Sequence, residues 1–121
     1  MINSQIIKFA ADTRNYGLKK RSKFIATSKN KICGDKITVE LKIIKNIIKC
    51  MNYETESCVF CQASASLLSA SIKHKNIKAL SLSLNAAMEK RNFKELLKTK
   101  ARINCIMLPF DALKKAIYNT K

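Results

Sequence analysis

The stretch Lys36-Ile37-Thr38-Val39-Glu40-Leu41-Lys42-Ile43 decides the fold of this chain. Its apolar residues alternate with polar and charged ones, and this period of two is typical of a β-strand with one buried face. Lys45-Asn46 predicts a short turn, after which the alternation resumes from Ile48 to Tyr53. We therefore expect an antiparallel hairpin over residues 36–54, with Cys50 as a core or strand residue, and an earlier strand near residues 24–27.

Helical spacing is found on both sides of the hairpin. The apolar residues between Ile2 and Thr13 predict an amphipathic helix, with Gly17 at its end. After the hairpin, small residues over 62–72 predict a helix that packs closely against the sheet, and further helices are expected over 76–90, 92–98 and 110–119. Pro109 fits the first turn of the last one. We expect an α+β fold: one domain over residues 1–121, with a small antiparallel sheet of about three strands packed against several helices.

The composition narrows the functions to consider. The 121 residues carry 24 Lys and Arg against 8 Asp and Glu, a formal net charge of +16, which attracts anionic partners. Only 4 of these bases are arginines, the residue that forms bidentate contacts with nucleic acid, so a nucleic-acid-binding module ranks low. No apolar run is long enough to span a membrane. The two glycines form no phosphate loop, and the single histidine, His74, supports no catalytic triad.

Five cysteines are the main chemical signal. Their odd number, without a secretory pattern at residues 1–20, indicates reduced thiols in a cytoplasmic protein and points to metal or sulfur chemistry. Cys33, Cys58 and Cys105 all fall at predicted element ends, Cys58 and Cys105 directly before helices whose partial positive charge favours a thiolate. Cys61 completes a C-x-x-C spacing with Cys58, but no second pair exists, so a zinc ribbon is not supported and Cys61 is expected to face elsewhere.

Three segments resemble a known family. Asn30-Lys31-Ile32-Cys33-Gly34-Asp35-Lys36-Ile37 resembles the Asn-Pro-x-Cys-Gly-Asp-x-Ile signature of the iron–sulfur cluster assembly scaffolds, the IscU, SufU and NifU amino-terminal family. Ser57-Cys58 followed by Gln62-Ala63-Ser64-Ala65-Ser66 resembles its second cysteine segment, and Asn104-Cys105-Ile106-Met107-Leu108 its third. The three motifs stand in the family order and cover residues 5–118, and the resemblance implies a SufE/NifU-like fold.

The resemblance also implies a site and a function. Cys33, Asp35, Cys58 and Cys105 would together hold a transient [2Fe-2S] cluster or a Zn²⁺ ion, since three thiolates suit both and one carboxylate is a weaker fourth ligand. A cysteine desulfurase of the SufS or IscS kind would supply persulfide sulfur, with Cys105 as the first candidate acceptor and Cys33 as the second, and apoproteins would receive the cluster. The chain would be a scaffold rather than an enzyme.

Departures from the family pattern leave alternatives open. Lys31 replaces a proline, Ser57 a glycine, and Asn104 the histidine that IscU proteins have beside the third cysteine. Residues 98–104 also lack the Leu-Pro-Pro-Val-Lys segment for the dedicated chaperone, which places the chain nearer the SufU-like branch, although the 47-position gap between Cys58 and Cys105 is short for the SufU insertion. The alternative to a cluster scaffold is a zinc-bound sulfur acceptor that activates the desulfurase without carrying a cluster.

Overall fold

The computed structural model describes residues 4–19, 22–31 and 34–118, and it has the expected α+β architecture. Three antiparallel strands form a sheet in the order β1 (Ile25–Lys29), β2 (Lys36–Ile44) and β3 (Ile47–Glu56). Lys45 and Asn46 make the two-residue turn between β2 and β3, both with positive φ, as hairpin turns of this length require. The predicted hairpin is confirmed.

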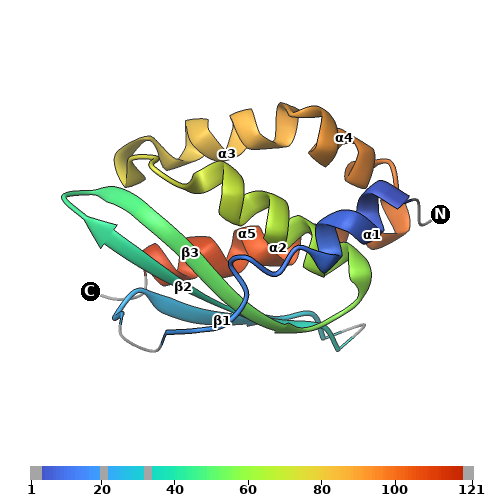
Figure 1. Ribbon diagram of the computed structural model, residues 1–121, viewed down its shortest axis with the longest axis horizontal. Helices are drawn as coiled ribbons and strands as arrows, with labels where there is room; N and C mark the ends of the chain where they lie inside the picture. Colours follow the sequence, from blue (N-terminus) through green and yellow to red (C-terminus); the bar gives the residue numbers. More distant parts are fainter. Residues whose placement is uncertain (1–3, 20–21, 32–33, 119–121) are drawn as a thin grey trace.

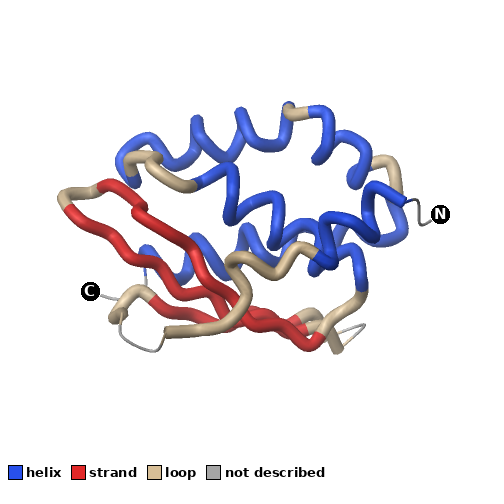
Figure 2. Tube along the Cα trace, in the orientation of Figure 1, coloured by secondary structure: helices blue, strands red, loops and turns tan. Residues whose placement is uncertain are grey.

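Helices cover one face of the sheet. They are α1 (Ser4–Ala11), α2 (Val59–Ile72), α3 (Leu80–Glu89), α4 (Arg91–Leu97) and α5 (Ile103–Tyr118), with short 3₁₀ turns at Ile77–Ala79 and Lys100–Arg102. The helices α2 and α5 lie against the sheet, and α3 and α4 lie over α2 on the side away from it (Figures 1 and 2). No helix within the described residues is long and apolar enough to cross a membrane.

The core lies between the sheet and the two inner helices. Ile37, Val39 and Leu41 on β2 are fully buried, and their inward direction follows from the alternation seen in the sequence. Ala63 and Ala65 of α2 are also fully buried, which confirms that the small residues allow this helix to approach the sheet closely.

A β-bulge in β3 reverses the faces of the sheet to which the side chains after it point. Lys42 pairs with Cys50, whereas the next residue, Ile43, pairs with Ile48, so Lys49 is the extra residue of β3. The bulge places Met51 on the buried face and turns Cys50 towards the open face, where it is half-buried. The expectation of Cys50 as a strand residue is confirmed, but it is not part of the core cluster.

The last helix begins earlier than the sequence predicts. Helix α5 starts at Ile103, so Pro109 lies inside it rather than in its first turn. A proline at this position removes the helical hydrogen bond to the carbonyl of Cys105. The helix continues because Ile106, Leu108 and Phe110 bury their side chains in the core, which outweighs the loss of one hydrogen bond.

Candidate metal centre

Backbone hydrogen bonds hold Asp35 in place directly before β2. The Asn30 N–H donates to the Asp35 carbonyl and the Gly34 N–H donates to the Asn30 carbonyl, each at 2.8 Å. Gly34 has φ of +77°, a conformation that other residues adopt at a cost, so the glycine of the Cys-Gly-Asp motif is explained by backbone geometry. Asp35 is buried in this position, with only 7% of its surface exposed.

Cys58 sits at the N-cap of α2. Its backbone is extended, with φ of −72° and ψ of 168°, and its side chain makes no capping hydrogen bond to the helix. The Gln62 N–H donates to the Cys58 carbonyl at 3.2 Å, which fixes the first turn. The half-buried thiol therefore remains available to a ligand at the helix end where partial positive charge favours an anion.

Cys105 lies in the first turn of α5, not ahead of the helix as the sequence predicts. Its side chain is 3% exposed. The following residue is tied to α2, because the fully buried Ser64 hydroxyl donates to the Ile106 carbonyl at 2.5 Å. This bond joins the helix that carries Cys58 to the helix that carries Cys105.

The three side chains converge on one point. One carboxylate oxygen of Asp35 and the Sγ atoms of Cys58 and Cys105 all lie within 4.8 Å of one another. Ligand atoms around a tetrahedral zinc ion with bonds of about 2.3 Å are about 3.8 Å apart, so approaches of about 1 Å or less would complete the geometry. Cys33, the fourth expected ligand, lies outside the described residues, and its part in the site remains a prediction.

Asp35 carries a further sign of a bound cation. Its Oδ2 atom is buried and has no hydrogen-bond partner among the described residues. A buried carboxylate oxygen without a partner is costly, and native proteins rarely keep one unless an ion or another group satisfies it. Two thiols and a carboxylate oxygen form a donor set that suits a soft or borderline metal ion.

The remaining described cysteines lie outside this cluster. Burial raises the pKa of the Cys61 thiol to about 11, although hydrogen bonds from Ser57 and Thr55 act against that rise. A thiol with this pKa stays protonated at neutral pH and is a poor ligand and nucleophile. Cys61 thus has a different role from Cys58, as the sequence predicts, and the exposed His74 is not part of the cluster either.

Thr55 is a supporting residue that the sequence analysis did not single out. Its hydroxyl lies 2.7 Å from the Lys36 carbonyl and 2.6 Å from the Ser57 hydroxyl. Lys36 follows Asp35 and Ser57 precedes Cys58, so one hydroxyl links the two segments that carry these ligands. The available signal was a threonine at an inward position of β3, where apolar residues otherwise occur.

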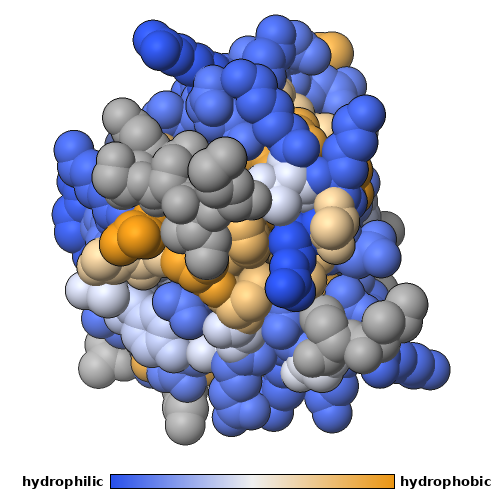
Figure 3. Space-filling view, turned by 90° about the vertical axis from the view of Figure 1, so that its right-hand side faces the viewer, coloured by the Kyte–Doolittle hydropathy of each residue, from blue (hydrophilic) through white to orange (hydrophobic). Residues whose placement is uncertain are grey.

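The end of the molecule beside the site presents apolar atoms to solvent. Figure 3 faces the side on which α1 lies in Figure 1 and shows an apolar strip bordered by hydrophilic side chains. Ile7 of α1 is 54% exposed, and Ile103 at the start of α5 is 38% exposed. Exposed apolar surface of this kind often marks a place where another protein docks.

The fold is thus a helix-covered antiparallel sheet with two thiols and a carboxylate gathered at helix and strand ends, a group that could hold a metal ion. The sequence matches the NifU-like N terminal domain family over residues 1–121, and the chain belongs to this family.

Curated relatives agree with this assignment, and a solved structure agrees with the fold. The chain is 30% identical over 132 aligned positions to the iron–sulfur cluster assembly scaffold protein IscU of Thermotoga maritima, covering 97% of this chain and 92% of the relative. It is also 30% identical over 119 positions to the zinc-dependent sulfurtransferase SufU of Bacillus subtilis, covering 86% and 80%. A crystal structure of a NifU-like N-terminal protein from Brucella abortus superposes with a TM-score of 0.82 at 24% identity, covering 98% and 92% of the two chains.

Proposed function

We propose that this protein is an iron–sulfur cluster assembly scaffold. It would accept sulfur from a cysteine desulfurase, assemble a transient [2Fe-2S] cluster on Cys33, Asp35, Cys58 and Cys105, and pass the cluster to apoproteins. The observation that carries the proposal is the convergence of Asp35, Cys58 and Cys105 within 4.8 Å, with a buried carboxylate oxygen that has no other partner in the described part of the chain. Membership of the NifU-like family and likeness to an IscU scaffold support it.

The ligand set suits a cargo that must leave. A carboxylate oxygen binds soft metal ions less strongly than a fourth thiolate would. Iron bound through Asp35 is therefore held by one weaker bond. Transfer of the cluster to a recipient that offers four thiolates is then energetically favourable. The buried position of Cys105 and the half-buried position of Cys58 protect the sulfur atoms from bulk oxidants.

Sulfur delivery follows ordinary thiol exchange chemistry. The thiolate of Cys105, or of Cys33, attacks the terminal sulfur of a persulfide on the desulfurase. A new S–S bond forms on the scaffold cysteine, the S–S bond on the desulfurase breaks, and the desulfurase thiolate leaves. Reduction of the bound sulfur to sulfide then takes two electrons, which a dithiol supplies in the assay. The exposed apolar strip beside the site fits docking of the desulfurase.

A zinc-dependent sulfur acceptor is the second candidate, and one observation favours it. In a [2Fe-2S] cluster two irons share the four protein ligands, so some ligand pairs lie far apart, whereas Asp35, Cys58 and Cys105 surround a single point. This arrangement fits one Zn²⁺ ion without rearrangement. The likeness to a zinc-dependent sulfurtransferase agrees with it.

Metal analysis and anaerobic reconstitution test both candidates. The purified protein is assayed for iron, zinc and labile sulfide, stripped of metal, and incubated with ferrous iron, sulfide and a dithiol. The scaffold role predicts a thiolate-to-iron absorption band and two irons per chain, which Cys58→Ser and Cys105→Ser abolish and Cys50→Ser leaves unchanged. Tight zinc binding without such a band, together with faster cysteine turnover by an added desulfurase, would instead establish the sulfur-acceptor role.

A further inference from the structure

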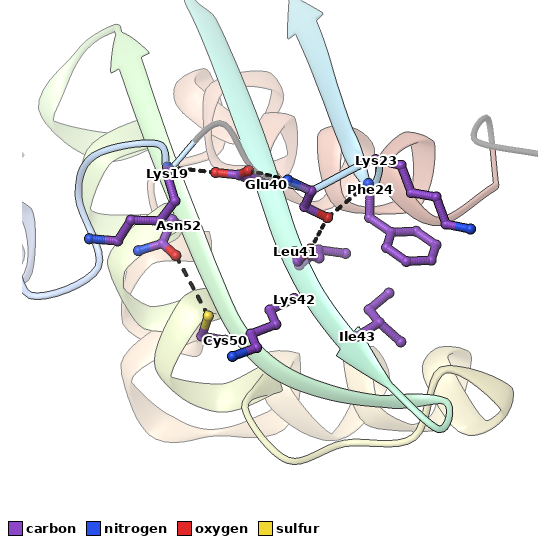
Figure 4. Close-up of a pocket in the computed structure, with 10 residues that line it drawn as sticks. Lys19, Lys23, Phe24, Glu40, Leu41, Lys42, Ile43, Cys50 and Asn52 are labelled. Carbon is purple, nitrogen blue, oxygen red and sulfur yellow. Dashed lines mark hydrogen bonds between the residues drawn. The ribbon is translucent and has the colours of Figure 1, made fainter.

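A hollow lies on the open face of the sheet, lined by residues other than the metal-ligand candidates. It has a volume of about 540 Å³, within the range of small-molecule sites in proteins. Lys19, Ser22, Lys23 and Phe24 line it from the segment before β1, and Lys42, Ile43, Cys50 and Asn52 line it from β2 and β3 (Figure 4). Asp35, Cys58 and Cys105 do not contribute to it.

One wall is fixed by the buried carboxylate of Glu40. The Lys19 N–H donates to Glu40 Oε1 at 2.7 Å and the Ser22 N–H donates to Oε2 at 2.9 Å. The Ser22 hydroxyl donates to the Leu41 carbonyl at 2.5 Å and accepts from the Phe24 N–H at 3.0 Å. These bonds fix Lys19, Ser22 and Phe24 against β2, so these residues border a preformed space (Figure 4).

The other wall follows from the β-bulge at Lys49. Because the bulge reverses the direction of the following residues, Cys50 and Asn52 face the open side beside Lys42. The Asn52 side-chain amide donates to the Asn15 carbonyl at 3.3 Å, and the Cys50 thiol donates to Asn52 Oδ1 at 3.6 Å. The polar atoms of this wall are thus held in place before any ligand arrives.

The exposed charges around the hollow are positive. Lys19, Lys23 and Lys42 are exposed, and none of them forms an ion pair with an acidic group of the described residues. Among the described residues that line the hollow, the one acidic side chain, Glu40, accepts hydrogen bonds from the backbone N–H groups of Lys19 and Ser22. The Lys23 ammonium lies 5.4 Å from the centre of the Phe24 ring, which puts positive charge directly beside apolar surface.

We propose that this hollow binds a small organic anion: a carboxylate, sulfonate or phosphate that carries an apolar or aromatic group. The apolar group would pack on Phe24 and Ile43, and the anionic group would lie in the positive field of Lys19, Lys23 and Lys42, whose ammonium groups point in different directions around the hollow (Figure 4). Asp35 and Lys42 are seven residues apart along an extended strand, about 23 Å, so the occupant does not touch the metal centre. The site is therefore independent of the proposed scaffold function.

A matched pair of fluorescent probes tests the proposal on the full chain. 8-Anilinonaphthalene-1-sulfonate carries a sulfonate, and N-phenyl-1-naphthylamine has the same ring system without it. We expect the sulfonate to bind one per chain, at least tenfold more tightly than the neutral probe. Lys23→Gln and Lys42→Gln should each weaken sulfonate binding about three- to fivefold and leave the neutral probe within twofold, as expected for partly exposed charges. Lys114→Gln, an exposed lysine of α5, is the control and should change neither probe.

Several outcomes would overturn the assignment. Equal affinity for the two probes, unchanged binding in both lysine variants, or amide chemical-shift changes confined to residues outside the hollow would each refute it. An acidic peptide with one phenylalanine that binds more tightly than the sulfonate, and loses affinity in the same variants, would show instead that the hollow receives a protein segment. Binding that survives Cys58→Ser and Cys105→Ser is expected, because the metal ligands take no part.

Discussion

Replacement of Asp35 by alanine should stabilise the metal-free protein and weaken metal binding, two effects of opposite sign. The carboxylate is 7% exposed and its Oδ2 atom has no hydrogen-bond partner among the described residues. An unpaired buried acceptor costs about 1 to 3 kcal/mol, and its removal offsets the small loss of packing. We expect the metal-free variant to gain about 1 to 2 kcal/mol, which raises Tm by about 4 to 8 °C in a chain of this size.

The zinc-loaded protein should respond in the other direction. Free zinc at about 1,000 times its Kd stabilises the native protein by about 4 kcal/mol. Loss of one ligand weakens binding at least about tenfold, which removes about 1.4 kcal/mol or more of that gain. The increase in Tm on adding zinc should therefore be smaller in Asp35→Ala than in the parent chain.

Differential scanning calorimetry with and without zinc, and with a chelator, measures both effects. Glu95→Ala is the control, because it removes a carboxylate of α4 that forms a surface ion pair with Lys98. It should change the free energy of unfolding by less than about 0.5 kcal/mol, both without metal and with zinc. A lower Tm for the metal-free Asp35→Ala protein would show that the carboxylate stabilises the fold. An unchanged zinc increment would show that Asp35 is not a ligand. Either result would refute the argument.

Three further predictions concern the supporting residues. Thr55→Val should lower the free energy of unfolding by about 1 kcal/mol and weaken zinc binding, because the hydroxyl links two segments that carry ligands. Denaturation measures the first effect and competition with a chelator the second. Unchanged zinc affinity would contradict this prediction. Burial raises the pKa of the Cys61 thiol to about 11, so this thiol ionises at a lower pH in the unfolded chain than in the folded one. The free energy of unfolding should therefore fall as pH rises from about 9 to 11. Cys61→Ala should remove this loss, and an equal loss in that variant would point to other groups. The hydrogen bond from the Ser28 hydroxyl lowers the pKa of Asp111 below its ordinary value of 3.8. The stability that this carboxylate contributes is present above that pH and should be lost as pH falls through the lowered pKa. Asp111→Asn should therefore make the free energy of unfolding less dependent on pH in the acid range.

Local sequence patterns predicted the hairpin but not the bulge in β3 or the start of α5. The alternation in residues 36–43 predicts which β2 side chains are buried, and Lys45-Asn46 predicts the turn. The same alternation carried past the turn puts Cys50 in the core, because nothing in the sequence marks Lys49 as an extra residue. The start of α5 was also misplaced, since a proline normally stands near the beginning of a helix and only the burial of its neighbours shows that Pro109 is internal.

The sequence by itself determined the class of fold, the identity of the chemical groups and their attachment to element ends. It did so because side-chain period, turn chemistry and family motifs are local properties of the chain. The family resemblance implied that Asp35, Cys58 and Cys105 share one site, but only the tertiary structure brought these three side chains within 4.8 Å of one another and directed Cys50 away from the core. This arrangement depends on how α2 and α5 pack on the sheet and on a single bulge, and these arise from contacts between residues far apart in the chain.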